Sequence, residues 1–221
     1  MTTYQIIRSK RKSIAIIIER DGTLVVRAPL RATKVQIEAL LAKKEQWIKE
    51  KQELNRSLWK ALAPKTFSDG EDFLFLGKSY PLAIVKNQEQ DLVFKDGFYL
   101  SRSAWKTAKA VFEKWYREQA RQILTERVDL YAQRNGFSFQ KIRINSARTR
   151  WGSCSAKGSL NFPWRLAMAP LSVIDYVVIH ELAHLHEKNH SRKFWAKVAS
   201  LMPDYKQRRE WLKRNGNTLK L

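Results

Sequence analysis

The stretch VVIHELAHLHEKNHSRKFW (Val177–Trp195) contains every histidine of the chain, namely His180, His184, His186 and His190. A protein of 221 residues that gathers all of its imidazoles within eleven positions is expected to use them together. Imidazole nitrogen is a preferred ligand of zinc and of related transition metals. The stretch therefore predicts a metal site.

His180 and His184 are four residues apart in a segment whose apolar pattern predicts a helix, so they share one face. Glu181 stands beside them, which completes the H-E-x-x-H pattern of zinc hydrolases. The preceding residues 173–179, VIDYVVI, are almost wholly apolar and predict a buried helix, where imidazoles without partners are costly. We expect two zinc ligands and, in Glu181, a general base that acts on a metal-activated water.

A third ligand has to come from a turn. Residues 188–189 suit the end of a helix, and a chain reversal there brings His190 back toward the ion. On an unbroken helix His190 would face away from the ion. Glu187, three residues after His184, is the rival third ligand, and we favour His190. His186 lies only two residues after His184, so we expect it on the surface or behind the ligands. Three protein ligands around Zn²⁺ leave a fourth position for water, which is the pattern of a catalytic site.

The net charge is the second unusual feature. Lys and Arg number 42 against 21 Asp and Glu, which gives +21 and a pI near 10.2. Such a field attracts polyanions, including nucleic acid and nucleotides. No helix-turn-helix, zinc-finger or RNP pattern accompanies the charge, so it predicts either an ordinary solvated surface or non-specific binding. Lys206–Arg214 is one candidate patch.

The elements predict an α+β protein in two parts. Residues 3–28 form a hairpin around Asp21-Gly22, a helix runs from Thr33 into the fifties, and 67–101 return to strands. Residues 1–101 are thus a β-rich region with one long helix, and residues 102–221 form the hydrolase domain. That domain is expected to contain, in order, a helix over 103–134, a strand over 141–147, a hairpin turning at 156–158, a helix capped by Ser172 with Asp175, a helix capped by Ser191, and a basic helix over 205–214.

The single cysteine, Cys154, excludes an internal disulfide and favours a reducing compartment. No apolar run reaches membrane-spanning length, so no membrane partner is expected. We expect a cytoplasmic protein, and the oligomeric state stays open.

Three segments resemble one protein family. They are RTRWGSCSAKGSLNFPWRL, PLSVIDYVVIHELAHLHEKNHSRKFW and LMPDYKQRREWLK, and they span Arg148 to Lys213. The chain resembles the YgjP-like family of metal-dependent hydrolases, which is similar to the SprT and WLM groups of zinc metallopeptidases. The resemblance implies a zincin-like C-terminal domain with a hairpin edge strand and an H-E-x-x-H helix. It also implies His180, His184 and His190 as ligands and Glu181 as the base.

The resemblance gives the RWGSCS segment a role as well. In zincins an edge strand lies above the metal and pairs with an extended substrate. Arg148, Trp151, Gly152, Ser153 and Cys154 would lie on or beside that strand and bind substrate. Trp151 is equally consistent with the core, and Cys154 suits a small buried thiol better than a nucleophile, because no histidine is left as its partner.

Three further residues have open roles. Met202 is ordinary core or lies beneath the metal, and either Tyr205 or Arg165 could stabilise an oxyanion.

The leading functional hypothesis is a zinc-dependent metallopeptidase-like hydrolase with a polypeptide substrate. The first alternative is a metal-dependent hydrolase of nucleotides or other phosphate compounds, which the positive charge suits. The second is a non-enzymatic nucleic-acid-binding protein with a structural metal, which an open coordination position and Glu181 disfavour.

Overall fold

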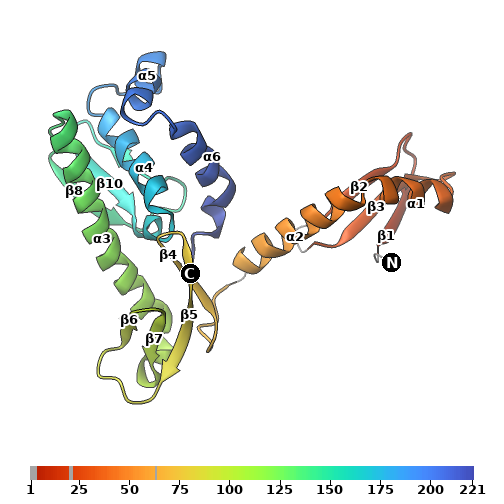
Figure 1. Cartoon of the computed structure of the whole chain (residues 1–221), viewed down its shortest axis with the longest axis horizontal. Helices are drawn as coiled ribbons and strands as arrows, with labels where there is room; N and C mark the ends of the chain where they lie inside the picture. Colours follow the sequence, from red (N-terminus) through yellow and green to blue (C-terminus); the bar gives the residue numbers. More distant parts are fainter. Residues whose placement is uncertain (1–3, 20–21, 63) are drawn as a thin grey trace. The chain divides into compact units, whose positions relative to one another are not determined.

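The chain forms two compact units, Met1–Ala63 and Pro64–Leu221 (Figure 1). The computed structural model describes residues 4–19, 22–62 and 64–221, and for residues 54–62 it describes the backbone alone. This division differs from the sequence-based boundary after residue 101, because the strands over residues 72–101 pack with the second unit. Each unit is built around a core of its own.

The first unit pairs a small sheet with two helices. Its strands lie in the order β1-β3-β2, with β2 antiparallel and β1 parallel to β3. The predicted hairpin is therefore present as β2 and β3, although Asp21 of its turn lies outside the described residues. Thr33 caps the first helix through a capping box with Gln36, and the long helix expected there is interrupted at Lys44. The elements are β1 Gln5–Ser9, β2 Ala15–Ile18, β3 Leu24–Pro29, α1 Lys34–Lys43 and α2 Glu45–Leu62.

A four-stranded sheet begins the second unit. Its order is β4-β5-β7-β6, with β5 and β7 parallel and the other two pairs antiparallel. Aromatic rings cover one face, and Phe73 lies 4.4 Å from Phe112 of the following helix and 5.9 Å from Phe98, between ring centroids. This aromatic cluster stabilises the packing of the sheet against the helix. The strands are β4 Asp72–Phe75, β5 Lys78–Val85, β6 Leu92–Phe94 and β7 Phe98–Ser101.

The long helix α3, Ala108–Asn135, follows a 3-10 turn, η1 Arg102–Thr107, and matches the helix predicted over 103–134. Every fourth residue along it is buried, which produces one continuous apolar stripe. Gly136 ends the helix in the left-handed conformation, with φ of 67°, which glycine adopts readily. The stripe consists of Ala108, Phe112, Tyr116, Ala120, Leu124, Val128 and Ala132.

A second, three-stranded sheet follows in the order β8-β10-β9. The central strand β10 is parallel to β8 and antiparallel to β9, so the predicted hairpin is present and β9 is an edge strand. Its elements are β8 Lys141–Asn145, β9 Ser153–Cys154, β10 Ser159–Pro163 and the 3-10 turn η2 Trp164–Met168.

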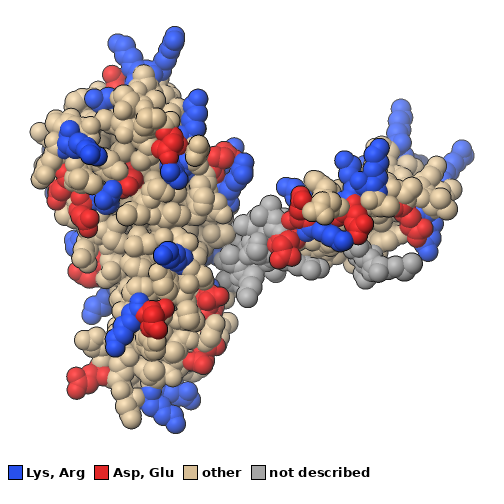
Figure 2. Space-filling view, viewed as in Figure 1, with Lys and Arg blue, Asp and Glu red and all other residues tan. Residues whose placement is uncertain are grey.

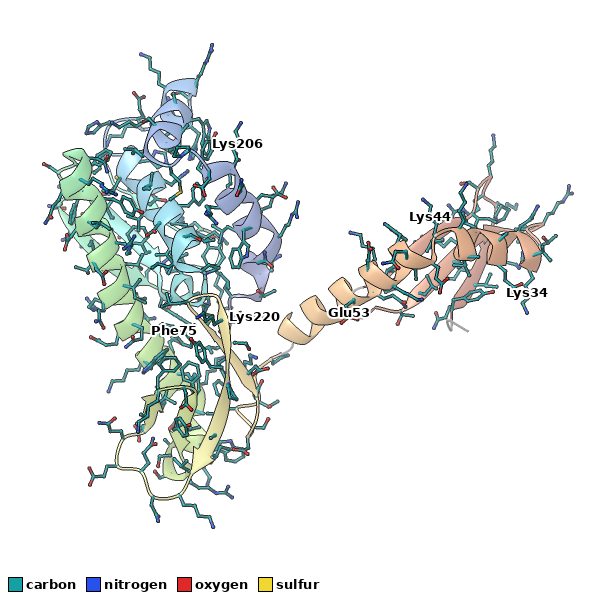
Figure 3. All side chains as sticks on the ribbon, in the orientation of Figure 1. Lys34, Lys44, Glu53, Phe75, Lys206 and Lys220 are labelled. Carbon is teal, nitrogen blue, oxygen red and sulfur yellow. The ribbon has the colours of Figure 1, made fainter. Side chains whose placement is uncertain are left out.

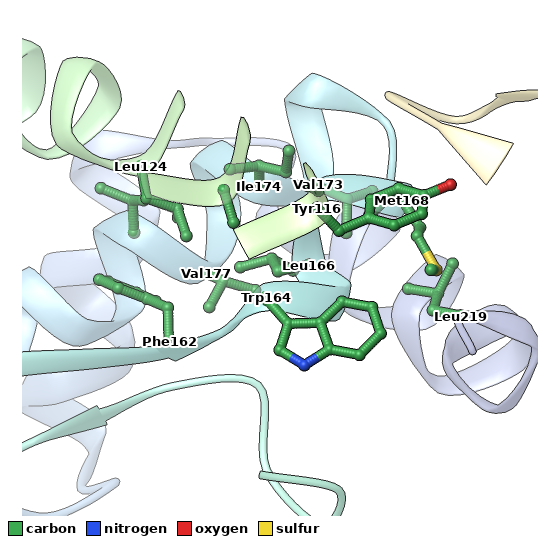
Figure 4. Close-up of a cluster of buried hydrophobic side chains, with 14 of the residues drawn as sticks. Tyr116, Leu124, Phe162, Trp164, Leu166, Met168, Val173, Ile174, Val177 and Leu219 are labelled. Carbon is green, nitrogen blue, oxygen red and sulfur yellow. The ribbon is translucent and has the colours of Figure 1, made fainter. Parts of the chain in front are cut away.

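The last helices complete this unit, with α4 packed between α3 and α6 (Figure 1). Side chains of α3, β10, η2 and α4 meet in one core around Trp164 and Tyr116 (Figure 4). This core holds α4, and with it the H-E-x-x-H segment, in a fixed position. The elements are α4 Leu171–Ala183, α5 Arg192–Leu201, α6 Tyr205–Asn215 and η3 Gly216–Thr218.

The predicted cap of α4 is wrong. Pro170 occupies the N-cap position and no side chain caps the helix. Asp175 instead accepts two hydrogen bonds from Arg127 of α3, at 2.6 and 2.9 Å, which joins the two helices through a largely buried ion pair. Ser191, by contrast, does cap α5 by accepting from the backbone N–H of Phe194.

The positive charge is widely distributed. On the face drawn in Figure 2, Lys and Arg are scattered over both units and interleaved with Asp and Glu. None of the described helices is both long and apolar enough to cross a membrane. The architecture as a whole is mixed α and β, with sheets in both units.

Candidate metal centre

Three histidines converge at the end of α4. His180 lies in the last turn of the helix, His184 occupies its C-cap, and His190 lies just before α5. The Nε2 atom of His190 is 3.0 Å from Nε2 of His180 and 3.2 Å from Nε2 of His184. Among the described residues, these three form the one cluster of His, Cys, Asp or Glu side chains suited to holding an ion.

The chain reverses earlier than the sequence predicts. Helix α4 ends at Ala183 rather than near residues 188–189, and a turn at 184–186 leads back toward the cluster. The backbone N–H groups of His186 and Glu187 both donate to the carbonyl of Ala183, which stabilises the turn. His190 can reach its partners because of this reversal.

A backbone contact settles which nitrogen of His184 faces the cluster. Its Nδ1 lies 2.9 Å from the carbonyl oxygen of Glu187. A carbonyl can only accept, so Nδ1 carries the hydrogen and Nε2 presents a lone pair to the other two rings. Such a support behind a ligand is usual at metal-binding histidines. Glu187 thus contributes its backbone, and its carboxylate is not part of the cluster.

The cluster fits a transition-metal ion. In a tetrahedral site with zinc–nitrogen distances of about 2.05 Å, two ligand nitrogens lie about 3.3 Å apart, close to the separations found here. Burial, the rings of His184 and His190, and Arg209 lower the pKa of His180 to about 3. Burial, His184 and Arg209 also lower the pKa of His190. Neutral imidazoles this close together offer the nitrogen donors that a transition-metal ion binds.

Glu181, the residue after His180, has a buried side chain. It is 4% exposed, and its buried Oε2 has no hydrogen-bond partner among the described residues. Burial raises the pKa of Glu181 to about 8, against a smaller lowering by Arg150. A buried carboxyl oxygen without a partner is costly, which is typical of a group kept for chemistry.

Gly152 lies directly against Glu181. A Cβ atom at position 152 would be 2.3 Å from Oε1 and 2.6 Å from Cγ of Glu181, closer than real contacts allow. The RWGSCS segment therefore passes over the carboxyl group at backbone distance. Gly152, which was expected to bind substrate, contacts Glu181.

The other residues of the RWGSCS segment lie in different surroundings. Ser153 and Cys154 lie on the edge strand β9, half-buried, and pair with Asn161 and Leu160 of β10. The pKa of Cys154 is raised, chiefly by burial, which disfavours the thiolate and agrees with a structural thiol. Trp151 packs partly against the core.

Arg148 and Arg165 lie away from the histidines. Together with Trp151 they line a separate cavity at the C-terminal end of α6, so the structure does not place Arg165 beside the cluster. The exposed His186 packs against the ring of Phe137, at 5.1 Å between centroids, and lies outside the cluster as predicted.

An aromatic wall with one cation borders the cluster. Trp195 stacks on His190 at 5.7 Å and on Tyr205 at 5.4 Å between ring centroids. The guanidinium of Arg209 lies 4.7 Å from the centre of the Trp195 ring. Sequence reasoning grouped Arg209 with a basic patch and missed this position, because no local pattern tells which face of α6 meets α5.

The predicted patch at Lys206–Arg214 does not form one free surface. Arg208 pairs with Asp204, the N-cap residue of α6, at 2.5 Å, and Arg214 pairs with Glu210 at 3.0 Å. Arg209 has no ion pair with any described residue and faces the aromatic wall instead. The cations of this helix therefore have different surroundings.

Comparison with known proteins gives one match. A family model described as YgjP-like, metallopeptidase domain, matches residues 12–215. No curated protein and no solved structure matches the chain.

Proposed function

The chain belongs to the YgjP-like metallopeptidase family, and from this premise we propose that it is a zinc-dependent, zincin-like peptidase. Family membership supports a metal-dependent, peptidase-like hydrolase. The proposal goes further and assigns His180, His184 and His190 as the metal ligands and Glu181 as the general base.

One observation carries this proposal. Three imidazole nitrogens converge at the end of α4, and Glu181, the residue after His180, is buried with an Oε2 atom that has no hydrogen-bond partner among the described residues. A donor set of nitrogen atoms suits zinc better than magnesium or calcium, which prefer oxygen ligands. A zinc ion bound there would act as a Lewis acid toward the attacked carbonyl group and the attacking water.

The protein residues supply the proton transfer. Glu181 follows His180 and is not part of the ligand cluster. A cation held by the histidines would lower the raised pKa of Glu181 and favour its ionised carboxylate, which can take a proton from water and later release it to the leaving amine. Glu181 is 4% exposed, and such burial strengthens the charge interactions of its carboxyl group. Gly152 limits where the carboxyl group can lie.

The edge strand favours an extended polypeptide as the substrate. Among the described strands, β9 pairs with β10 alone, and it lies against α4. A free strand edge offers backbone hydrogen bonds to an added strand, whatever the side chains of that strand. Ser153 and Cys154 are the residues of this edge.

A phosphate-containing substrate is the second candidate. Arg209 presents a positive charge near His190 and has no ion pair with a described carboxylate. That charge would suit the anionic oxygens of a nucleotide or another phosphate compound as well as it suits an oxyanion. A non-enzymatic role does not explain why a buried carboxyl oxygen of Glu181 has no hydrogen-bond partner among the described residues.

An activity screen with a matched variant tests the proposal. Zinc-loaded protein is incubated with an unfolded, fluorescein-labelled polypeptide and, separately, with nucleoside triphosphates, beside Glu181→Gln and His186→Ala. We expect polypeptide cleavage that Glu181→Gln lowers by on the order of 10²- to 10⁴-fold at unchanged zinc content. His186→Ala should behave as the wild type.

Two results would contradict the proposal. Full activity of zinc-loaded Glu181→Gln would remove Glu181 as the base. Release of phosphate with no cleavage of polypeptide would replace the peptidase by the phosphate hydrolase.

A further inference from the structure

A second concave site lies at the C-terminal end of α6, apart from the histidines. It is a cavity of about 740 Å³, and no residue of the histidine cluster lines it. The loop before β9, the turn η2 and the segment around η3 contribute its walls. We call it the basic cavity, after the five cations that line it: Lys109, Arg148, Arg165, Lys213 and Lys220.

The charges in the basic cavity have one sign. Among the residues that the structure describes, no Asp or Glu side chain lines it. In the described part of the chain, Lys109, Arg148, Arg165 and Lys213 form no ion pair. Lys220 lies beyond the C-terminal end of α6 (Figure 3). Like charges gathered in a concave surface reinforce one another, and an anionic ligand relieves their repulsion.

Arg165 is held in place before any ligand arrives. Its Nη1 donates to the carbonyl of Ser146 at 3.2 Å, and its guanidinium lies 4.3 Å from the centre of the Trp164 ring. Burial lowers the pKa of Arg165 most, Arg148 and Arg117 lower it further, and Glu113 acts in the opposite direction. An arginine fixed by stacking loses little freedom when it binds a phosphate group.

The basic cavity also contains an aromatic ring. Trp151 lines it half-buried, and its indole packs on Gly216, where a Cβ atom would come within 2.9 Å of the ring. Cations that follow a backbone, together with a flat ring for bases, are the elements of single-strand nucleic-acid binding. An acidic polypeptide would use the cations but offers no base to stack on Trp151.

We propose that the basic cavity binds the phosphate backbone of single-stranded nucleic acid, with a base stacked on Trp151. The site is distinct from the metal centre, and the proposal does not rest on the peptidase assignment.

Binding of a labelled oligonucleotide to the full-length protein tests this proposal. The probe is a fluorescein-labelled oligothymidylate, and its anisotropy is measured over a range of salt concentrations. The variant Lys109→Gln, Arg148→Gln, Lys213→Gln removes three exposed cations of the basic cavity. The control, Lys78→Gln, Lys86→Gln, Lys95→Gln, removes the same charge from exposed positions in β5 and just after β5 and β6.

We expect the basic-cavity variant to bind the oligonucleotide at least about 10-fold more weakly than the wild type. The slope of log affinity against log salt concentration should become less negative by about 2. Both changes should be far smaller in the control. Equal losses in the two variants would overturn the proposal, because binding would then be a property of the net charge alone.

A second comparison addresses the class of ligand. Trp151→Leu should weaken binding of the oligothymidylate several-fold and leave binding of inorganic polyphosphate unchanged. Two outcomes would contradict nucleic acid as the ligand: polyglutamate binding as tightly as the oligonucleotide, or an equal effect of Trp151→Leu on both phosphate probes. A melting curve of each variant confirms that the protein remains folded.

Discussion

Replacing Gly152 by alanine tests how Glu181 is positioned. The new methyl group would lie 2.3 Å from Oε1, 2.6 Å from Cγ and 2.7 Å from Cδ of Glu181. Ordinary contact begins at 3.4 Å, so the carboxyl group has to retreat by about 1 Å, a displacement that can lower turnover by on the order of 10²-fold. The ligands should be spared, because the three atoms nearest to the methyl group all belong to Glu181.

The assay compares turnover, zinc content and melting temperature in a cycle of four proteins. They are the wild type, Gly152→Ala, Glu181→Asp and the double variant. Aspartate is shorter by one methylene, so its carboxyl group no longer occupies the space that the new methyl group needs. Adding Gly152→Ala to Glu181→Asp should therefore change turnover by less than about 3-fold. The much larger effect of Gly152→Ala in the wild type would show that the two positions are strongly coupled.

Two results would refute this reasoning. Undiminished turnover of Gly152→Ala would show that the carboxyl group tolerates the displacement or does not act as the base. An equal effect of Gly152→Ala in the wild-type and Glu181→Asp backgrounds would show that the methyl group acts elsewhere, for example on β9. A loss of zinc together with activity would point to a wider rearrangement.

Two further predictions concern metal binding and stability. His190→Ala should lower the zinc content measured after dialysis. His186→Ala alters a ring that packs against Phe137 and should leave the zinc content unchanged. The reverse pattern would show that His186, and not His190, is the third ligand. Asp175→Asn should lower the free energy of unfolding in urea by about 3 kcal/mol, because it leaves the Arg127 guanidinium without its charged partner. The exposed pair partner Glu210, changed to Gln, should have a much smaller effect, and equal losses would contradict the role of burial.

Features that depend on local pattern could be predicted from the sequence. The apolar stripe of α3, its glycine cap and the Ser191 cap all follow from spacing within a few residues. The grouping of His180 and His184 follows in the same way, from one helical turn. His190 required a chain reversal, and the prediction placed that reversal later than Ala183.

Features that depend on contacts between distant segments could not be predicted. Asp175 has the spacing of a capping residue, yet Arg127, 48 positions away, binds it instead. The close approach of Gly152 to Glu181 and the position of Arg209 over Trp195 likewise arise where separate elements pack. The boundary between the units also depends on packing, because the strands over 72–101 carry no local signal that they belong with α3.

Because the chain reverses after α4, a bound metal ion would also stabilise the local structure of this segment. Two of the proposed ligands end a rigid helix, and the third follows a turn that is held by a few backbone hydrogen bonds. An ion bound to all three acts as a non-covalent cross-link that closes the loop from His180 to His190 and joins the end of α4 to the start of α5. Metal affinity is then also folding free energy for this segment. Amide hydrogens between residues 184 and 190 should accordingly exchange with solvent more slowly in the metal-bound protein than after chelation.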